Sequence, residues 1–439
     1  MTTEPLSLRG RLYADETPPA EQTANGAAHP DVRDHNASYD LDDVEEPSET
    51  QGFDPENAGL SAELPPGTAL LCVKNTTYAG RPSFELYLHH RGRVRGANRP
   101  TDLDQRRQPG LAPARLVELA AKSGWRATYR RVKGWWRTET VLADWVDRLR
   151  AAENPRLVVW DHTAHEIPWE LLYRQPLHET SPADTGGWIG ATLPVIRWTT
   201  VYDASRAWRY DARPRDCRGG VLVYEDPEFA VPADGVRRHE VGERSTTMRH
   251  LHARLREKET GFGLLLMRCH GRYSEDVDEF TLGGVPFPEL DEDWRMPALR
   301  ATGAAVLINS CVSARPVVDR RYNAAVPRNF AEIFLRWGAG AVIATLAEIS
   351  KVHAHDFAAR LVRNAQRGPV NLADALTAHR ADYAREAEQA IAEGDDRRSE
   401  AAIEAFFTSF MYAYFGHPGT TLALQAPEEP EEPEGDEVP

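Results

Sequence analysis

The chain has 439 residues, of which 41% are apolar, so it is long and apolar enough to bury at least one sizeable hydrophobic core. Its formal charge of −15 is concentrated at the two ends, because residues 1–64 carry a net charge of −12 and residues 425–439 carry −7. The body between them is slightly basic, but its basic residues are nearly all arginines scattered along the chain, which does not indicate a nucleic-acid-binding protein.

The two acidic ends also lack any regular spacing of apolar residues. Residues 1–64 are rich in Pro, Asp, Glu, Ala and Asn, and the final stretch reads APEEPEEPEGDEVP. Chains of this composition bury too little apolar surface to offset the entropy lost on folding. We therefore predict a disordered acidic segment over residues 1–64 and a disordered acidic tail over residues 425–439.

No segment of the chain predicts export or insertion into a membrane. The first residues, MTTEPLSLRG, do not form a basic region followed by an apolar one, and no apolar run reaches the length of a membrane span. The four cysteines form neither a C-x-x-C pair nor a cluster with histidines at zinc spacing. We expect a cytoplasmic protein with reduced thiols, no metal, no cofactor and no membrane partner.

The first folded segment, residues 65–150, is predicted to be a small α+β module. Two alternating apolar runs over residues 68–92 predict a β-hairpin, and helices are predicted over 113–124 and 137–152. The second helix has an apolar stripe that needs a partner surface, so we expect the module to pack on the domain that follows. Interleaved Arg and Trp at 129–137 are a pattern that nucleic-acid-binding proteins also use, but a solvated helix surface explains them more simply.

From residue 151 onward, continuous apolar runs alternate with amphipathic helical patterns. This alternation is typical of a parallel sheet covered on both faces, so the sequence predicts an α/β fold with a mostly parallel central sheet. The predicted strands cover 156–161, 220–226, 263–269, 304–310 and 339–346, and the predicted helices cover 241–259, 329–338, 350–365, 372–394 and 399–416, with a turn and short helix at 165–173.

Two of the predicted strands end on residues that suit nucleophilic catalysis. LLLMRCHGRY places His270 after one apolar run, and AAVLINSCVSA places Cys311 after another. Ligands bind beyond the carboxyl ends of the strands in such sheets, so both side chains are expected at the same edge. A thiol there can act as a nucleophile when a histidine takes its proton.

Backbone groups near these residues also suit acyl chemistry. The N–H of Gly271 has no side chain beside it, and together with the N–H of Cys311 it can hold a developing oxyanion. Two simpler interpretations remain: Cys311 as a small buried hydrophobe and His270 as part of a turn. Cys269 is a rival nucleophile, but the alternation of side chains along a strand predicts that it points into the core.

Several motifs resemble those of the CHAT-domain branch of the caspase-like cysteine peptidases. The first two are the His-Gly segment and the Ser-Cys segment described above, and the similarity extends over roughly two-thirds of the chain. The further matching segments are LGG (282–284), HEIPWELLY (165–173), NFAEIFLRWGAGAVIATL (329–346) and AYFGHPGTTLAL (413–424).

The resemblance implies a caspase-like three-layer α/β/α sandwich over residues 151–424. It also implies a catalytic dyad of His270 and Cys311 and a cytosolic endopeptidase that cleaves a protein substrate without a metal. Such proteins often act in bacterial regulated proteolysis or defence. The chain has no sensor motif of its own, so the implied activator is a separate protein.

The sequence also departs from the family pattern. Asn309 stands where metacaspase-like relatives have an acid that contacts the substrate, so a basic specificity does not follow. Asn309, Asp276 and Asp278 are therefore only candidate substrate-binding residues, and the two aspartates suit a solvated loop equally well. His417 stands where the closing motif often has Asp, and Arg320 with Arg321 is either a processing site or an ordinary connection.

Two functions of other classes remain open at this stage. A catalytically silent caspase-like scaffold that binds partner proteins is one alternative, although both dyad residues and Gly271 are present. A Cys–His amidase or acyltransferase acting on a small molecule is the other. NSCVS lacks the G-x-C-x-G elbow that is typical of glutaminase-type enzymes, which argues against this second alternative.

Overall fold

The computed structural model describes residues 66–78, 81–90, 93–96, 111–135, 140–161, 163, 165–175, 186–199, 213–230, 235–257, 261–321 and 326–425. The predicted disordered segment at 1–64 and nearly all of the predicted tail lie outside these residues. All described residues belong to one compact unit, residues 55–439.

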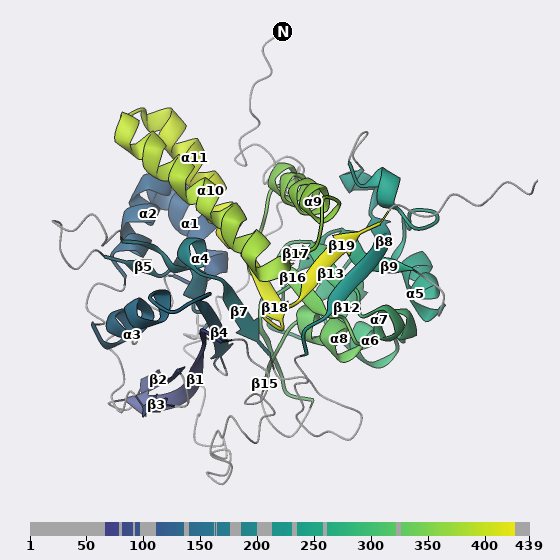
Figure 1. Ribbon diagram of the computed structural model, residues 1–439, viewed down its shortest axis with the longest axis horizontal. Helices are drawn as coiled ribbons and strands as arrows, with labels where there is room; N and C mark the ends of the chain where they lie inside the picture. Colours follow the sequence, from purple (N-terminus) through teal and green to yellow (C-terminus); the bar gives the residue numbers. More distant parts are fainter. Residues whose placement is uncertain are drawn as a thin grey trace, which may run out of the picture. The chain divides into compact units, whose positions relative to one another are not determined.

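The centre of this unit is a sheet of twelve strands among the described residues, in the order β17-β19-β8-β9-β13-β16-β18-β7-β4-β1-β2-β3 (Figure 1). The strands are β1 Thr68–Tyr78, β2 Arg81–His90, β3 Arg93–Gly96, β4 Arg156–Asp161, β7 Val195–Trp198, β8 Asp216–Glu225, β9 Phe262–Arg268, β13 Ala305–Asn309, β16 Ala341–Thr345, β17 Val370–Asn371, β18 Tyr412–Gly416 and β19 Thr421–Leu424.

The sheet consists of two parallel half-sheets that run in opposite directions. The first half-sheet contains β7, β4 and β1, which pair in parallel, and is extended by the antiparallel hairpins of β2 and β3. The second half-sheet contains β19, β8, β9, β13 and β16, which also pair in parallel. β18 joins the two halves, because it is antiparallel to β16 and parallel to β7.

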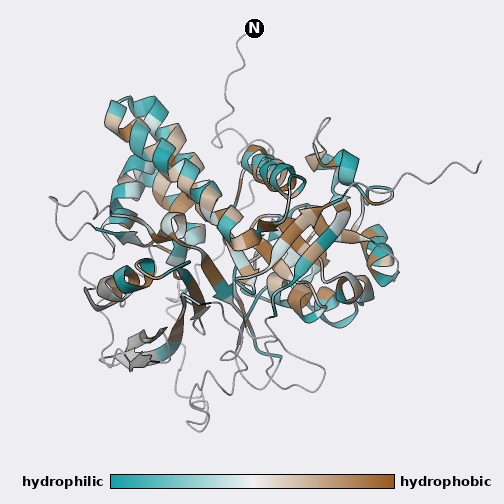
Figure 2. Ribbon diagram, viewed as in Figure 1, coloured by the Kyte–Doolittle hydropathy of each residue, from teal (hydrophilic) through white to brown (hydrophobic). Residues whose placement is uncertain are grey.

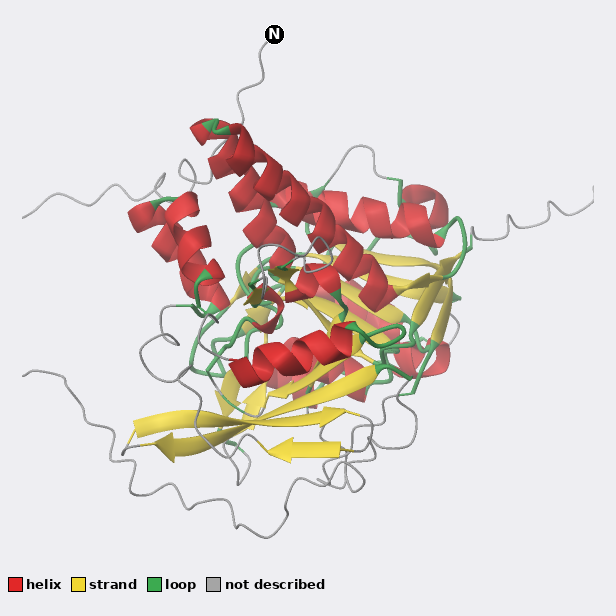
Figure 3. Cartoon of the chain, turned by 60° about the vertical axis from the view of Figure 1, so that its left-hand side comes forward, coloured by secondary structure: helices red, strands yellow, loops and turns green. Residues whose placement is uncertain are grey.

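Helices pack against this twisted sheet (Figure 3). The helices are α1 Pro113–Ser123, α2 Trp125–Lys133, α3 Thr140–Arg150, α4 Ile189–Thr192, α5 Met248–Arg256, α6 Phe287–Glu292, α7 Pro297–Thr302, α8 Phe330–Arg336, α9 Lys351–Ala365, α10 Leu372–Glu393 and α11 Asp396–Phe410, with short 3-10 helices η4 Trp169–Leu171, η5 Pro227–Phe229 and η6 Arg237–His239. The smaller sheets pair β5 Tyr173–Arg174 with β6 Gly187–Trp188, β11 Thr281–Leu282 with both β10 Gly271–Arg272 and β12 Val285–Pro286, and β14 Val317–Asp319 with β15 Val326–Arg328.

The second half-sheet is the middle layer of three. On one face, side chains such as Leu265 and Ile308 share a buried core with α5, α6, α7 and α8. On the other face, the Asn309 side chain of β13 donates a 2.8 Å hydrogen bond to the carbonyl of Ala354 in α9. The predicted α/β class, with helices on both faces of a mostly parallel sheet, is confirmed.

A separate apolar core lies over the first half-sheet. It contains side chains from β1, β4 and β7 and from α1, α2, α3, α10 and α11. In Figure 2, α10 and α11 show hydrophilic residues alternating with hydrophobic ones, as expected for helices that pack on one side only. Strands of the predicted 65–150 module belong to the same continuous sheet as the rest, because β1 pairs in parallel with β4.

Most predicted elements are present, with one clear error. The predicted strands correspond to β4, β8, β9, β13 and β16, and the hairpin over 68–92 corresponds to β1 and β2. The helix predicted over 399–416 is wrong at its end, since α11 stops at Phe410 and Tyr412–Gly416 is the buried strand β18. A short apolar run gives the same pattern in a buried strand and in a buried helix, which explains the error.

Candidate active site

His270 and Cys311 follow two neighbouring parallel strands. β9 and β13 pair in register, with Arg268 opposite Asn309, and each candidate residue comes two positions after its strand ends. β8 and β16 flank this pair, so the carboxyl ends of four adjacent parallel strands meet at this edge. The predicted position of both side chains at one edge of the sheet agrees with this topology.

The loop that carries His270 lies directly against the turn that carries Cys311. A Cβ atom placed on Gly271 would be 2.1 Å from the carbonyl oxygen of Cys311 and 2.6 Å from the Oγ atom of Ser310. Real Cβ atoms do not approach other atoms so closely, so only glycine fits at position 271 in this arrangement. The His-Gly motif therefore serves a contact between the two loops.

The thiol of Cys311 is partly buried, and the backbone N–H groups of Ile349 and of Cys311 itself favour its charged form. Burial raises the pKa of the Cys311 thiol, and the nearby Glu348 adds to this increase, while the two N–H groups oppose it. The net effect is an increase, so the thiol form predominates at neutral pH.

The imidazole of His270 is exposed and is bound by a carboxylate that the sequence did not suggest. Its Nε2 atom lies 2.9 Å from Oε2 of Glu228, which follows β8 in η5. The ring of Phe229 contacts the imidazole edge-on at 4.6 Å, and Lys351 lies over Phe229 and donates to the carbonyl of Glu228 at 2.8 Å. The hydrogen bond from His270 lowers the pKa of the Glu228 carboxyl.

This arrangement orients the histidine for proton transfer without completing a dyad. When Nε2 donates its proton to Glu228, Nδ1 carries the lone pair that a general base requires. Within the described residues, however, no hydrogen bond joins the side chains of His270 and Cys311. Catalytic hydrogen bonds are often long in a protein without substrate and shorten only when substrate binds.

The backbone groups predicted to hold an oxyanion lie at the junction of the two loops. Gly271 lies against the backbone of Cys311, and the second N–H belongs to Cys311 itself. Both groups are therefore next to the candidate nucleophile. Their assignment to an oxyanion hole stays a prediction.

The three candidate substrate-binding residues have different surroundings. Asn309 is buried, and its side chain is fully engaged, since it donates to Ala354 and accepts from the hydroxyl of Tyr412 at 3.0 Å. We therefore do not carry Asn309 into the proposed substrate site. Asp276 and Asp278 are exposed in the turn between β10 and β11, where the Asp276 carboxylate accepts the N–H of Asp278.

Cys269, the rival nucleophile, lies in the core. Its side chain is 1% exposed and belongs to the buried cluster on the α5 to α8 face, as strand alternation predicts. Burial raises the pKa of its thiol to about 12. Cys269 is therefore unreactive at neutral pH, whereas Cys311 is the accessible thiol of the pair.

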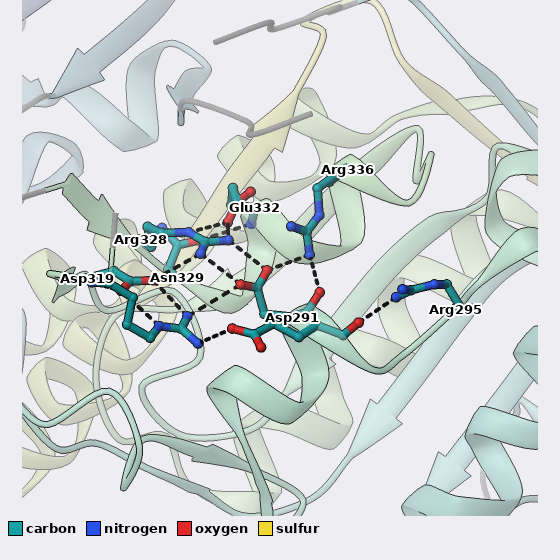
Figure 4. Close-up of polar contacts among 9 residues, drawn as sticks. Asp291, Arg295, Asp319, Arg328, Asn329, Glu332 and Arg336 are labelled. Carbon is teal, nitrogen blue, oxygen red and sulfur yellow. Dashed lines mark hydrogen bonds and ion pairs between the residues drawn. The ribbon is translucent and has the colours of Figure 1, made fainter. Parts of the chain in front are cut away.

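The segment that follows Cys311 is anchored by a buried ion cluster (Figure 4). Arg328 of β15 contacts Asp319 of β14 at 3.0 Å, Asp291 of α6 at 2.8 Å and Glu332 of α8 at 2.5 Å, and all four side chains are buried. Arg321 of the candidate processing site also joins the cluster, with its guanidinium 2.8 Å from Asp319. Its involvement favours a structural role for Arg321.

Other predicted absences concern nucleic acid, membranes and metals. Tyr129 of α2 and the nearby Trp135 are buried, so their rings are not free to stack on nucleobases, and among the described residues of this cluster Arg130 and Arg131 are exposed. Among the helices that the structure describes, none has both the length and the apolar character of a bilayer span. The same described residues contain no group of three or more His, Cys, Asp or Glu side chains that could hold a metal ion.

Comparisons with known proteins give structural similarities of low score. No protein-family model matches the sequence, and no curated protein does. Two crystal structures of the Saccharomyces cerevisiae separase–securin complex match with TM-scores of 0.34 and 0.35 and sequence identities of 11% and 12%. In each case 64% of this chain is covered, but only 16% and 17% of the separase chain. The CHAT resemblance therefore rests on the sequence motifs.

Proposed function

We propose that this chain is a caspase-like cysteine endopeptidase of the CHAT type, with Cys311 as the nucleophile and His270 as the general base. The observation that carries the proposal is the contact of Gly271 with Cys311 at the carboxyl edge of the sheet, which brings both loops together. The sequence motifs around both residues support it independently. An accessible thiol and an exposed, carboxylate-bound imidazole supply the two groups that the reaction needs.

The reaction assigned to these groups proceeds through a thioester. His270 takes the proton of the Cys311 thiol, and the sulfur attacks the carbonyl carbon of the scissile peptide bond. The N–H groups of Gly271 and Cys311 hold the oxyanion that forms, and the imidazolium returns its proton to the leaving amine. Water, deprotonated by His270, then hydrolyses the thioester and regenerates the thiol.

The geometry also supports a resting state that needs activation. The pKa of the Cys311 thiol is raised, and the His270 imidazole is bonded to Glu228 and, within the described residues, makes no hydrogen bond to the sulfur. The hydrogen bond of the dyad therefore still has to form, and binding of a separate regulatory protein is its proposed cause. A role in cytoplasmic regulated proteolysis or defence in bacteria follows from the resemblance, and the four free cysteines suit a reducing compartment.

A catalytically silent scaffold that binds partner proteins is the second candidate. The absence of a hydrogen bond between the His270 and Cys311 side chains, within the described residues, is the observation that favours it. The same geometry is expected for a resting protease, so the reactivity of the Cys311 sulfur has to be measured to distinguish the two functions.

The deciding experiment is active-site labelling with a peptidyl acyloxymethyl ketone, followed by intact-mass measurement and a fluorescent peptide-library assay. We expect one adduct in the wild type, none in Cys311→Ala and one again in Cys269→Ala. Each protein is labelled in cell extract or together with the partners that co-purify with Cys311→Ala. Labelling at Cys269, or cleavage that persists in Cys311→Ala, would contradict the assignment. Cleavage of no peptide, with no adduct even when the partner is present, would favour the scaffold.

A further inference from the structure

Arg315 lies four residues after Cys311 and contacts two residues from other parts of the chain. Its guanidinium binds the carboxylate of Glu166, with Nε 3.0 and 3.1 Å from the two oxygens. The same guanidinium stacks on the ring of Tyr273, 3.5 Å from the ring centroid. The Tyr273 hydroxyl in turn donates to the carbonyl of Pro316 at 3.1 Å.

These contacts connect both catalytic loops to the first half-sheet. Tyr273 lies three residues after His270, and Arg315 belongs to the turn of Cys311. Glu166 comes from the segment between β4 of the first half-sheet and η4. One arginine therefore holds together the histidine loop, the cysteine turn and a residue of the other half of the sheet. We call Glu166, Arg315 and Tyr273 the clamp.

The backbone has positive φ angles on both sides of the contact between Arg315 and Glu166. Val312, three residues before Arg315, has a φ of 54°, and Glu166 has a φ of 50°. A β-branched residue is rare in this left-handed region and persists there only where the surroundings enforce it. The N–H of Val312 donates to the carbonyl of Ala347, and the N–H of Arg315 donates to the carbonyl of Val312, so backbone hydrogen bonds stabilise the turn. The side-chain contacts of the clamp add a further constraint on this turn.

The clamp is sensitive to the loss of either charge because it is largely buried. The side chains of Arg315 and Glu166 are 21% and 14% exposed. Burial raises the pKa of the Glu166 carboxyl, Arg315 and the more distant Arg115 oppose the increase, and Glu275 adds to it. A cavity of about 60 Å³, also lined by Asp161 and Arg197, adjoins the pair and leaves room for Arg315 to move if Glu166 releases it.

We propose that Glu166 of the first half-sheet positions the catalytic turn through Arg315 and Tyr273, so that the two half-sheets are coupled at the reaction centre. Arg315 and Glu166 are positioning residues, because neither touches the reacting atoms. Of the measurements that test this inference, only peptide cleavage rests on the proposed function. A displacement of residues 165–167 would therefore reach the turn of Cys311 through this contact.

The test compares Arg315→Ala, Arg315→Lys and Glu166→Gln in the full chain. We expect kcat for peptide cleavage to fall by about tenfold or more in Arg315→Ala, with a smaller change in KM, because misplacing the nucleophile affects the chemical step. Iodoacetamide labelling, located by peptide mass spectrometry, should become faster at Cys311 and unchanged at Cys269. Arg315→Lys keeps the charge but loses the paired contact and most of the stacking, so a partial effect is expected.

The matched control is Arg156→Ala, which removes another arginine contact between the first half-sheet and a later helix. Arg156 binds Asp374 of α10 through two hydrogen bonds of 2.9 and 3.0 Å and has no contact with either catalytic loop. Cys311 labelling in this variant should stay within twofold of the wild type. Equal acceleration at Cys311 and Cys269, or no acceleration in Arg315→Ala, overturns the clamp. Because iodoacetamide needs no substrate, this result stands even if the protein cleaves no peptide.

Discussion

The two half-sheets have the same parallel architecture but very different strand ends. In the first half-sheet, β4 ends on Asp161, whose carboxylate accepts from Thr163 at 2.6 Å and from the indole of Trp169 at 2.9 Å. In the second half-sheet, β9 and β13 lead to an exposed imidazole and an accessible thiol. The polar groups at this end of β4 are therefore engaged in hydrogen bonds that stabilise the fold.

The comparison shows that a polar residue at the carboxyl end of a parallel strand is not sufficient for a reaction centre. The residue also has to keep a reactive atom free of structural bonds. Cys72 lies inside β1 and is fully buried, and burial raises the pKa of its thiol to about 12, so its sulfur is not accessible either. His270 and Cys311 of the second half-sheet, by contrast, keep exposed or partly exposed reactive atoms.

Replacing the nucleophile should give the largest effect and tests the comparison directly. Cys311→Ala should abolish peptide cleavage while the melting temperature changes little, because the thiol lies at the edge of the sheet and is not part of either core cluster. A cleavage assay and a thermal melt measure the two quantities. Residual cleavage at the wild-type rate would mean that the reaction centre lies elsewhere.

Gly271→Ala should give the next largest effect. The added Cβ would lie 2.1 Å from the Cys311 carbonyl oxygen, so the two loops have to separate, and a displacement of about 1 Å lowers the rate by about a hundredfold. The control is Gly261→Ala, where a Cβ would meet no atom within 4 Å. Cleavage at a similar rate in both variants would show that the contact between the loops is not required.

The pH dependence of Cys311 alkylation shows whether the pKa of this thiol is raised, as it is for the buried thiols. Only the thiolate reacts, and the pKa of Cys311 is raised above its ordinary value of 9.0. Iodoacetamide labelling of the resting protein should therefore rise about tenfold per pH unit and continue to rise above pH 9. The denatured chain supplies the reference. A plateau below pH 8 would instead indicate a thiolate already paired with His270.

Glu228→Gln should have a smaller effect, because the pair with His270 is exposed to solvent. The amide still accepts a hydrogen bond but no longer stabilises the imidazolium, so kcat should fall by about three- to tenfold with KM nearly unchanged. Glu243→Gln, which replaces another exposed carboxylate, is the control. Faster cleavage in Glu228→Gln would mean that Glu228 restrains His270 in the resting state.

The smallest effects are expected for the buried cysteines of both half-sheets. Cys72→Ala and Cys269→Ala should each keep full cleavage activity and lower the free energy of unfolding by about 1 kcal/mol, since each removes a small buried side chain. Denaturant unfolding measures this loss. If Cys269→Ala loses activity but Cys72→Ala does not, Cys269 contributes to the reaction centre.

The sequence predicted the second half-sheet better than the first. Strands β9 and β13 are continuous apolar runs, so their ends, and with them His270 and Cys311, could be located from the pattern alone. β18 could not be identified, because its short apolar run follows a helix without a break. Its neighbours lie far away in the sequence.

The contacts of individual side chains could not be predicted from the sequence either. Nothing in the sequence places Glu228 beside His270, since 42 residues separate them and only the pairing of β8 with β9 brings them together. Asn309 was a candidate substrate residue because of its position two residues before Cys311 in the resembling motif. The partner that binds its side-chain oxygen, Tyr412, is 103 residues away and is brought close by the fold.

The position of β18 in the sheet has a consequence for how the protein is made. β18 separates β16 from β7, and it belongs to a late part of the chain, residues 412–416. Until a ribosome has released these residues, both neighbouring strands expose unpaired edges, and the two halves cannot join. A nascent chain therefore contains both His270 and Cys311 before it contains the strand that joins the two halves of the sheet.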